Sequence, residues 1–188
     1  MYAYKSLADP NHYILYLQND TNTNGYNKWF YFAVKNKKKM VNYTFSIVNY
    51  RKNLAFVKQG MKPSRFSLKQ QEAKGNGWSR CCNKVAIYRS KVVEENSFVE
   101  HYTLTFEATF EYENDTNYFS LIPPYSYSKL IKFIQESKRL FHDKNGIKFQ
   151  YKTLAYTLSN TQVPYVTISK GEEPSKKNIV VLARQHPG

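Results

Sequence analysis

Residues 102–112 read Tyr-Thr-Leu-Thr-Phe-Glu-Ala-Thr-Phe-Glu-Tyr, and apolar side chains alternate there with threonine and glutamate without a break. A period of two over that length is typical of a β-strand that buries one face and exposes the other to solvent. We therefore expect Phe106 and Phe110 to face a protein core. Thr105 and Thr109 should face solvent.

Shorter apolar runs surround this stretch and complete the pattern. Four of them precede it: Tyr13–Leu17, Trp29–Val34, Tyr43–Val48 and Val85–Tyr88. Aromatic residues make up 16% of the chain, and aromatic side chains are enriched in strands. Several short strands separated by turn residues, with no helical pattern between them, predict a mainly β fold, namely an antiparallel β-sandwich.

The pattern changes after Pro123-Pro124. From Ser126 onward, apolar residues recur at the spacing of one helix face. Ser126 is a plausible N-cap, and Asn145-Gly146 is a plausible end of the helix. The sequence therefore predicts one amphipathic helix after the strands.

Two apolar strands are expected after this helix, at Val163–Ser169 and Ile179–Ala183. A helix followed by apolar strands indicates the opening of an α/β domain. The expected organisation is a β-sandwich domain over residues 1–122, followed by the truncated start of an α/β domain over residues 123–188.

The chain is strongly basic, with a formal net charge of +14 over 188 residues. Such a balance favours a polyanionic partner, although a lysine-coated soluble surface is an equally ordinary cause. Lys35–Lys39 is the densest basic cluster, and we interpret it as a solvated hairpin loop rather than a binding patch. Lys62 and Arg65 are the other basic candidates.

The two cysteines are adjacent, at Cys81 and Cys82. Neighbouring cysteines rarely form a disulfide, and no CxxC spacing occurs, so a reducing compartment is expected. The pair could be a redox or metal-binding pair, but we favour ordinary turn or strand residues. The N-terminus lacks a signal-peptide pattern, and no stretch approaches the roughly 20 apolar residues of a membrane span. These features predict a cytoplasmic protein with no membrane association.

The end of the chain carries the candidate metal ligand. Arg184-Gln185-His186-Pro187-Gly188 follows the apolar run Ile179–Ala183. A histidine at the carboxyl end of a strand lies where open α/β sheets place their ligands. By position alone, a lone histidine such as His186 is more often structural than a metal ligand, and it is the one histidine for which we consider a metal-ligand role. His12, His101 and His142 have no ligand spacing and are expected to be surface residues.

Four sequence blocks, in order, resemble the cytosolic carboxypeptidases, a branch of the zinc metallocarboxypeptidases. The blocks are Asn19–Asn22 with Trp29–Phe32, Gly60–Pro63 with Gly77–Arg80 and Ile87-Tyr88, Asp115–Phe119 with Pro124–Ser128, and Thr153-Leu154 with Pro164–Ile168 and Ala183–Gly188. Each block alone is weak, but the ordered set is specific and spans the chain from about Tyr13 to its end.

The resemblance implies an N-terminal β-sandwich followed by an α/β domain with one zinc ion. In that family the histidine of His-Pro-Gly and the glutamate after it bind zinc, which polarises the scissile carbonyl and activates water. Here His186 matches, and the glutamate would follow Gly188. Cys82 stands where relatives tend to carry glycine. The remaining family ligands and the catalytic residues have no counterpart, so the 188-residue chain alone is expected to be inactive.

The resemblance also implies a substrate and a location. The family removes C-terminal or side-chain glutamates from acidic protein tails such as those of tubulin, so we expect acidic tails as partners and association with microtubules or cilia. No nucleic-acid recognition motif occurs, and no nucleic-acid partner is expected. The alternative is a non-catalytic β-sandwich module that binds an acidic protein or the microtubule surface.

Other conspicuous residues have ordinary interpretations. Trp78 and Arg80 are expected to anchor the sandwich. Glu172 and Glu173 lie in a Gly-Glu-Glu-Pro stretch that is typical of a solvated turn. Neither glutamate is assigned a catalytic role.

Overall fold

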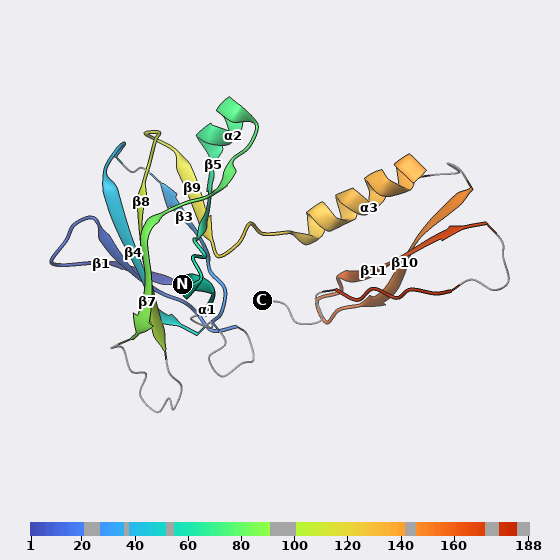
Figure 1. The fold of residues 1–188 in the computed structure, drawn as a ribbon, viewed down its shortest axis with the longest axis horizontal. Coiled ribbons are helices and arrows are strands. Elements are labelled where there is room, and N and C mark those ends of the chain that lie inside the picture. The colour runs from blue at the N-terminus through green and yellow to red at the C-terminus, as the bar shows by residue number, and fades with distance from the viewer. Residues whose placement is uncertain are drawn as a thin grey trace. The chain divides into compact units, whose positions relative to one another are not determined.

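The computed structural model describes residues 1–20, 27–35, 38–51, 55–90, 101–141, 146–171 and 177–183. The chain divides into two compact units, Met1–Pro123 and the residues from Pro124 onward. Each unit has its own elements (Figure 1). Whether a domain that folds independently ends at Ile122, as the sequence indicates, stays a prediction.

The first unit contains two β-sheets. The five-stranded sheet has the order β1-β2-β4-β8-β7 and the four-stranded sheet the order β3-β9-β5-β6. The strands are β1 (Tyr2–Lys5), β2 (His12–Tyr16), β3 (Tyr31–Lys35), β4 (Asn42–Tyr50), β5 (Ser64–Ser67), β6 (Trp78–Arg80), β7 (Asn83–Arg89), β8 (Tyr102–Thr109) and β9 (Thr116–Ser120). The predicted mainly β fold is confirmed, and the described pairs are antiparallel apart from β2 with β4, which run parallel.

An aromatic cluster joins the two sheets. Phe45 of β4 and Phe106 of β8 come from the five-stranded sheet, with ring centroids 5.6 Å apart. Phe119 of β9 comes from the other sheet, with its centroid 5.5 Å from Phe45 and 5.8 Å from Phe106. All three rings are buried. Because large aromatic side chains contribute most of the burial energy of a core, this contact holds the sandwich together.

Strand β8 confirms the alternation from Leu104 onward, whereas Thr103, expected on the exposed face, is buried. Phe106 and Phe110 are 0% and 1% exposed, whereas Thr105 and Thr109 are half-buried. The strand ends three residues earlier than predicted, because its ladder with β4 ends where Asn42 pairs with Thr109. The apolar alternation continues past that point, but the backbone there has no strand partner among the described residues.

Two short helices interrupt the strands of the first unit, so the expectation of strands alone is wrong. They are α1 (Ala55–Lys58) and α2 (Leu68–Lys74). Ser67 caps α2, since its Oγ accepts a hydrogen bond from the Gln70 amide at 2.9 Å. Gly75 ends α2 in the left-handed region, at a φ of 71°, which glycine adopts without strain.

The second unit consists of a helix and a hairpin. Helix α3 (Tyr127–Phe141) begins after Ser126, whose Oγ accepts a hydrogen bond from the Lys129 amide at 3.3 Å, as predicted. The predicted stop at Asn145-Gly146 falls partly outside the described residues. Strands β10 (Ile147–Tyr156) and β11 (Gln162–Lys170) pair antiparallel, and α3 packs on β10. Strand β11 confirms the prediction at Val163–Ser169, whereas β10 was not predicted.

Ile179–Ala183 is not a strand, and that prediction is wrong. These residues have no regular secondary structure, and Ile179 to Leu182 are all highly exposed. A strand needs a hydrogen-bonded neighbour, and no described strand pairs with this segment. Apolar composition alone is therefore insufficient to form a strand here. Separately, the described residues contain no helix long and apolar enough to cross a membrane.

Candidate functional site

His186, the candidate metal ligand, lies outside the described residues, as do Glu172, Glu173 and His142. Within the described residues, no group of three or more histidine, cysteine, aspartate or glutamate side chains is gathered in a way that holds a metal ion. A catalytic zinc ion needs three protein ligands and an open position. The described part of the chain therefore does not fit a zinc site.

The other two described histidines take structural positions. His12 begins β2, and its Nε2 lies within hydrogen-bond distance of Ser46 Oγ, at 2.9 Å. Ser46 Oγ in turn lies 2.9 Å from Thr105 Oγ1, so the three side chains are linked by hydrogen bonds. His101 is only 6% exposed, and its Nδ1 lies 3.4 Å from the carbonyl oxygen of Asn49. The prediction of a surface residue is wrong for His101, because the imidazole is buried in contact with Asn49 of β4.

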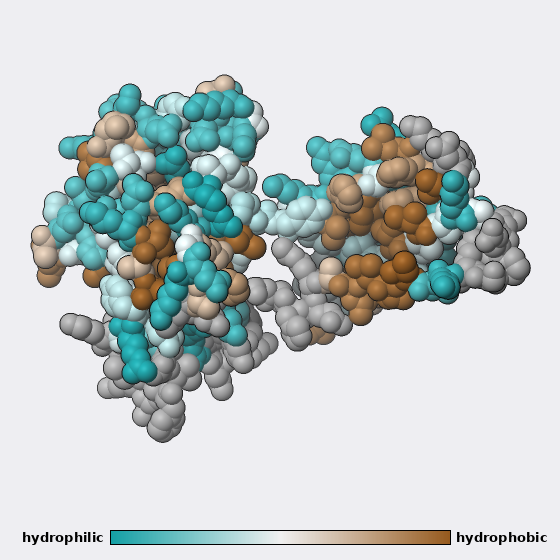
Figure 2. All heavy atoms as spheres, viewed as in Figure 1, coloured by the Kyte–Doolittle hydropathy of each residue, from teal (hydrophilic) through white to brown (hydrophobic). Residues whose placement is uncertain are grey.

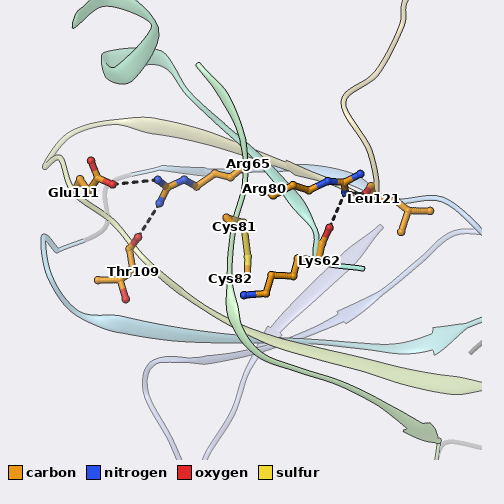
Figure 3. Close-up of a disulfide and its surroundings, with 8 residues drawn as sticks. All are labelled: Lys62, Arg65, Arg80, Cys81, Cys82, Thr109, Glu111 and Leu121. Carbon is orange, nitrogen blue, oxygen red and sulfur yellow. Dashed lines mark hydrogen bonds and ion pairs between the residues drawn. A yellow bond between two sulfur atoms is a disulfide. The ribbon is translucent and has the colours of Figure 1, made fainter. Parts of the chain in front are cut away.

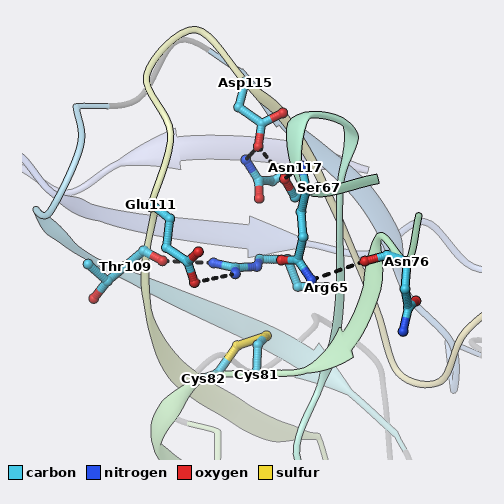
Figure 4. Close-up of polar contacts among 10 residues, drawn as sticks. Arg65, Ser67, Asn76, Cys81, Cys82, Thr109, Glu111, Asp115 and Asn117 are labelled. Atoms are coloured by element: carbon cyan, nitrogen blue, oxygen red, sulfur yellow. Dashed lines mark hydrogen bonds and ion pairs between the residues drawn. A yellow bond between two sulfur atoms is a disulfide. The ribbon is translucent and has the colours of Figure 1, made fainter. Parts of the chain in front are cut away.

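Asp115 is the centre of a polar cluster in the first unit. Its Oδ2 accepts hydrogen bonds from Ser67 Oγ at 2.7 Å and Asn117 Nδ2 at 2.9 Å, and its Oδ1 accepts from the Lys69 amide at 3.1 Å. Figure 4 shows Asp115 facing Ser67 and Asn117. The carboxylate is buried and tied to the N-terminus of α2 and to β9. Its contacts are internal, so its role is to join these elements.

Two arginines are bound to backbone carbonyls. Arg65 is 8% exposed, and its Nη1 donates to the carbonyl of Thr109 at 2.8 Å while Nη2 lies 3.6 Å from Glu111 Oε1 (Figure 4). Arg80 Nη1 donates to the carbonyls of Lys62 and Leu121 at 2.7 and 3.0 Å (Figure 3). The prediction that Arg80 anchors the sandwich is confirmed. Arg65 is an anchor as well, so its proposed role as a surface cation is wrong.

The two cysteines are joined in the structure by a disulfide between Cys81 and Cys82, drawn in Figure 3. This contradicts the expectation of two separate turn or strand residues. The backbone supplies the reason. Cys82 has a φ of 81°, in the left-handed region, so it departs from the alternation of side chains that an extended strand imposes.

The lysine cluster is exposed where it is described. Lys35, Lys38 and Lys39 are exposed, and residues 36 and 37 lie outside the described set. The segment leaves β3 in one sheet and enters β4 in the other, so it connects the two sheets and is not a hairpin loop. Its solvated character is as predicted, but its place in the fold is not.

The second unit exposes much of its apolar surface. Figure 2 shows apolar side chains gathered on one face of this unit. Ile134 is its one buried large apolar side chain among the described residues, at 5% exposure. The exposed ones are Tyr125, Tyr127, Phe133, Leu140, Phe141, Leu154, Tyr156, Leu158, Tyr165, Ile168, Ile179, Val180, Val181 and Leu182.

The sequence alone does not single out Asp115, marks Arg65 only as a basic candidate, and does not predict the disulfide. Asp115 stands in a sequence block already noted for its resemblance, but no periodicity marks it as a hydrogen-bond centre. A serine followed by a short helical stretch, at Ser67, was a usable signal for the cap that Asp115 supports. Nothing local marked Arg65 as buried, because its partner carbonyl lies 44 residues away.

No family model matches the chain. Curated proteins do match it. Cytosolic carboxypeptidase 2 of Danio rerio is 33% identical over 181 residues, which is 94% of this chain and 24% of that protein. Cytosolic carboxypeptidase 1 of Gallus gallus is 30% identical over 194 residues, covering 95% of this chain and 16% of that protein. Cytosolic carboxypeptidase 2 of Homo sapiens is 32% identical over 189 residues, covering 96% and 20%.

Solved structures share the fold. A metallo-carboxypeptidase from Burkholderia cenocepacia superposes with a TM-score of 0.57 at 16% identity, covering 92% of this chain and 38% of that one. A putative carboxypeptidase A from Shewanella denitrificans gives a TM-score of 0.55 at 18% identity, covering 86% and 35%. The resemblance noted in the sequence is thus confirmed. The chain is related to the cytosolic carboxypeptidases along about 95% of its length and spans a quarter or less of theirs.

Proposed function

We propose that this chain, a relative of the cytosolic carboxypeptidases, forms part of a zinc metallocarboxypeptidase. The enzyme would remove C-terminal or side-chain glutamates from acidic protein tails, such as those of tubulin. One observation carries the proposal: similarity to these carboxypeptidases runs along about 95% of the chain. The word cytosolic in the relatives' names supports a cytoplasmic location, and an acidic-tail substrate supports association with microtubules or cilia.

Charge supports the choice of substrate. The whole chain carries +14, and the described residues of the second unit hold eight lysines and arginines against one glutamate, Glu136. The basic residues are Lys129, Lys132, Lys138, Arg139, Lys148, Lys152, Lys170 and Lys177. A positive surface speeds the encounter with a negatively charged tail, and this acceleration falls as salt is added.

Zinc is the metal that the family implies, and the described residues do not supply its ligands. His186 remains the candidate ligand of this chain, with the other ligands expected from sequence that this chain does not contain. The 188-residue chain by itself is therefore expected to have no peptidase activity. Incubation with a polyglutamate-tailed peptide and zinc should release no glutamate, whereas release that a chelator abolishes would contradict this expectation.

A direct test uses the coding sequence that follows the codon for Gly188. If the proposal is right, a glutamate codon comes next in frame, and the longer polypeptide releases glutamate from the tailed peptide. In that polypeptide, His186→Ala should abolish release and lower the zinc content. The matched control His12→Ala alters a residue tied to Ser46 in the sandwich and should leave the zinc content unchanged.

The second candidate is a non-catalytic sandwich that binds an acidic protein. The self-contained aromatic core of the first unit and the net charge favour it. Here a stop codon would follow Gly188, and the 188-residue chain would bind a polyglutamate peptide with an affinity that falls steeply between low and physiological salt. Binding to a polyglutamine peptide of the same length serves as the uncharged control.

A further inference from the structure

The disulfide-bonded cysteines occupy the crossover between the two sheets of the first unit. Strand β6 ends at Arg80 in the four-stranded sheet, and β7 begins at Asn83 in the five-stranded sheet. Cys81 and Cys82 are the whole connection, and the chain contains no other cysteine. A chemical change at this pair therefore acts on the point where the backbone passes from one sheet to the other.

The backbone around Cys81 and Cys82 has an unusual conformation. Cys82 at a φ of 81° and Lys84 at 46° both lie in the left-handed region, which residues other than glycine seldom adopt. The pairing of β7 with β8 shifts register between Asn83 and Ala86. The Cys81 amide donates to the carbonyl of Pro63 at 3.0 Å, which fixes one end. The unusual conformation is thus confined to the residues directly after Cys81.

The pair is reachable and yet in contact with the core. Both cysteines are partly buried and pack against the apolar cluster of the sandwich. Val57, Met61 and Val85 are also partly buried and pack against the same cluster. Partial exposure admits a small reagent to the sulfur atoms. Contact with the core means that a change at the sulfur atoms is transmitted to packed side chains.

Stabilisation of the fold is a poor explanation of this disulfide bond. Disulfides stabilise a fold chiefly by closing long loops in the unfolded chain, and this one encloses no intervening residue. The relatives of this chain are named cytosolic carboxypeptidases. In the cytosol of mesophilic organisms, disulfides are mostly transient and serve catalysis or redox sensing. Reversible chemistry at the pair therefore accounts for the bond better than mechanical reinforcement does.

We propose that Cys81 and Cys82 form a reversible redox site that reacts with small disulfides of the oxidised-glutathione class. A thiolate of the reduced pair attacks the disulfide, forms a mixed disulfide and releases one glutathione thiolate. The second cysteine then attacks the mixed disulfide at the protein sulfur, forms the Cys81–Cys82 bond and releases a second glutathione. Two protein thiols are oxidised to the disulfide, one glutathione disulfide is reduced to two glutathione thiols, and the two protons lost by the protein pass through water to the glutathione thiolates.

The reduced pair also presents a dithiol to soft electrophiles. A trivalent arsenical of the phenylarsine oxide type forms two As–S bonds with adjacent thiols and releases one water, without any change of oxidation state. Since both sulfur atoms belong to neighbouring residues, the second bond forms within the same molecule. Such intramolecular closure typically raises affinity by about a hundredfold or more over a single bond.

The first test equilibrates the 188-residue chain in buffers of varied reduced-to-oxidised glutathione ratio, followed by alkylation and mass spectrometry. In reducing buffer both cysteines should be alkylated. In oxidising buffer the monomer should take no label, weigh two hydrogens less, and yield a peptide that holds both cysteines joined. Two free thiols in every buffer, or glutathione adducts and dimers in place of the internal bond, would overturn the proposal.

The second test uses two matched variants and phenylarsine oxide. Cys82→Gly removes one thiol and suits the left-handed backbone, and Cys81→Ser removes the other with little change of volume. Circular dichroism and tryptophan fluorescence identical to the wild type establish that both variants fold. The reduced wild type should bind the arsenical about a hundredfold more tightly than either variant. Equal binding by the wild type and a folded variant would refute a two-sulfur site.

Discussion

The two units of this chain contrast in how much apolar surface they bury. The first unit, through Pro123, encloses a cluster of phenylalanine and tyrosine rings between its two sheets. The second unit has a well-formed helix and hairpin, but among its described residues Ile134 is the one large apolar side chain that is buried. Local hydrogen bonding therefore suffices to form α3, β10 and β11, whereas a core requires contacts between distant segments.

Hydrogen exchange should give the largest difference between the units. Amides of β8 at its centre, near Phe106, are expected to exchange only on global unfolding, which costs roughly 5–15 kcal/mol in ordinary domains. Amides of Ile179–Ala183 should exchange with almost no protection, because this segment has no strand partner among the described residues. Equal protection in both segments would show that the units form one cooperative domain and would remove the contrast.

Limited proteolysis tests the same difference between the two units independently of hydrogen exchange. Residues 122–126 are mostly exposed and have no regular structure, so chymotrypsin should cut first at Tyr125 or Tyr127. A resistant fragment ending there should persist. Early cuts within β4 or β8 would contradict the assignment of the stable core to the first unit.

Truncation of a core aromatic should have the next largest effect. Phe106→Ala removes a fully buried ring in contact with Phe45 and Phe119 and should lower the free energy of unfolding by about 3–5 kcal/mol. Thr105→Ala, one residue away on the other face, removes a hydrogen bond to Ser46 and should cost about 1 kcal/mol. Urea melts followed by tryptophan fluorescence report on the first unit alone, because Trp29 and Trp78 are the chain's two tryptophans. Equal costs would refute the face assignment.

The sequence predicted those parts of the fold that depend on local pattern. The alternation around Phe106 and the helical spacing after Ser126 each repeat over at least ten residues, and both elements formed, although the strand ends three residues earlier than expected. Strand β10 carries a weaker alternation at Ile147, Phe149 and Tyr151, which is too short to predict a strand by itself. The apolar run Ile179–Ala183 was wrongly predicted to be a strand, because apolar composition does not show whether a neighbouring strand is present to pair with it.

The polar anchors could not be predicted from pattern, for a different reason. Arg65 and Asp115 each bond to partners more than 40 residues away, so no local window contains the information. His101 is buried by the same kind of distant contact, with Asn49. The disulfide depends on the φ of one residue, Cys82. Each of these is fixed only once the sheets have assembled.

Loss of the buried carboxylate should have an effect close to that of the aromatic change. Asp115→Ala leaves Ser67 Oγ, Asn117 Nδ2 and the Lys69 amide without their acceptor, and should cost about 3 kcal/mol. Glu113→Ala alters an exposed carboxylate on the same loop and should change stability by less than about 0.5 kcal/mol. Differential scanning calorimetry of both variants makes the comparison. A loss confined to the second unit's transition would show that Asp115 acts elsewhere than in the sandwich.

The smallest expected effect concerns alkaline pH and the buried end of β4. Burial raises the pKa of the Tyr50 phenol well above its ordinary value. As pH rises past the ordinary value of about 10, the unfolded chain gives up this proton while the folded chain keeps it. The unfolded state then binds fewer protons, so stability falls with rising pH; the contribution is fully present below about pH 10 and is lost above it.

One such group changes the free energy of unfolding by at most about 1.4 kcal/mol per pH unit. Tyr50→Phe keeps the ring beside Phe30 but has no proton to lose, so its stability should decline less steeply between about pH 9.5 and 11. Tryptophan fluorescence isolates this slope to the first unit, where both tryptophans lie. If wild type and Tyr50→Phe show parallel slopes, the phenol is not shielded from solvent, and the sandwich is less tightly closed at this end than its aromatic core implies.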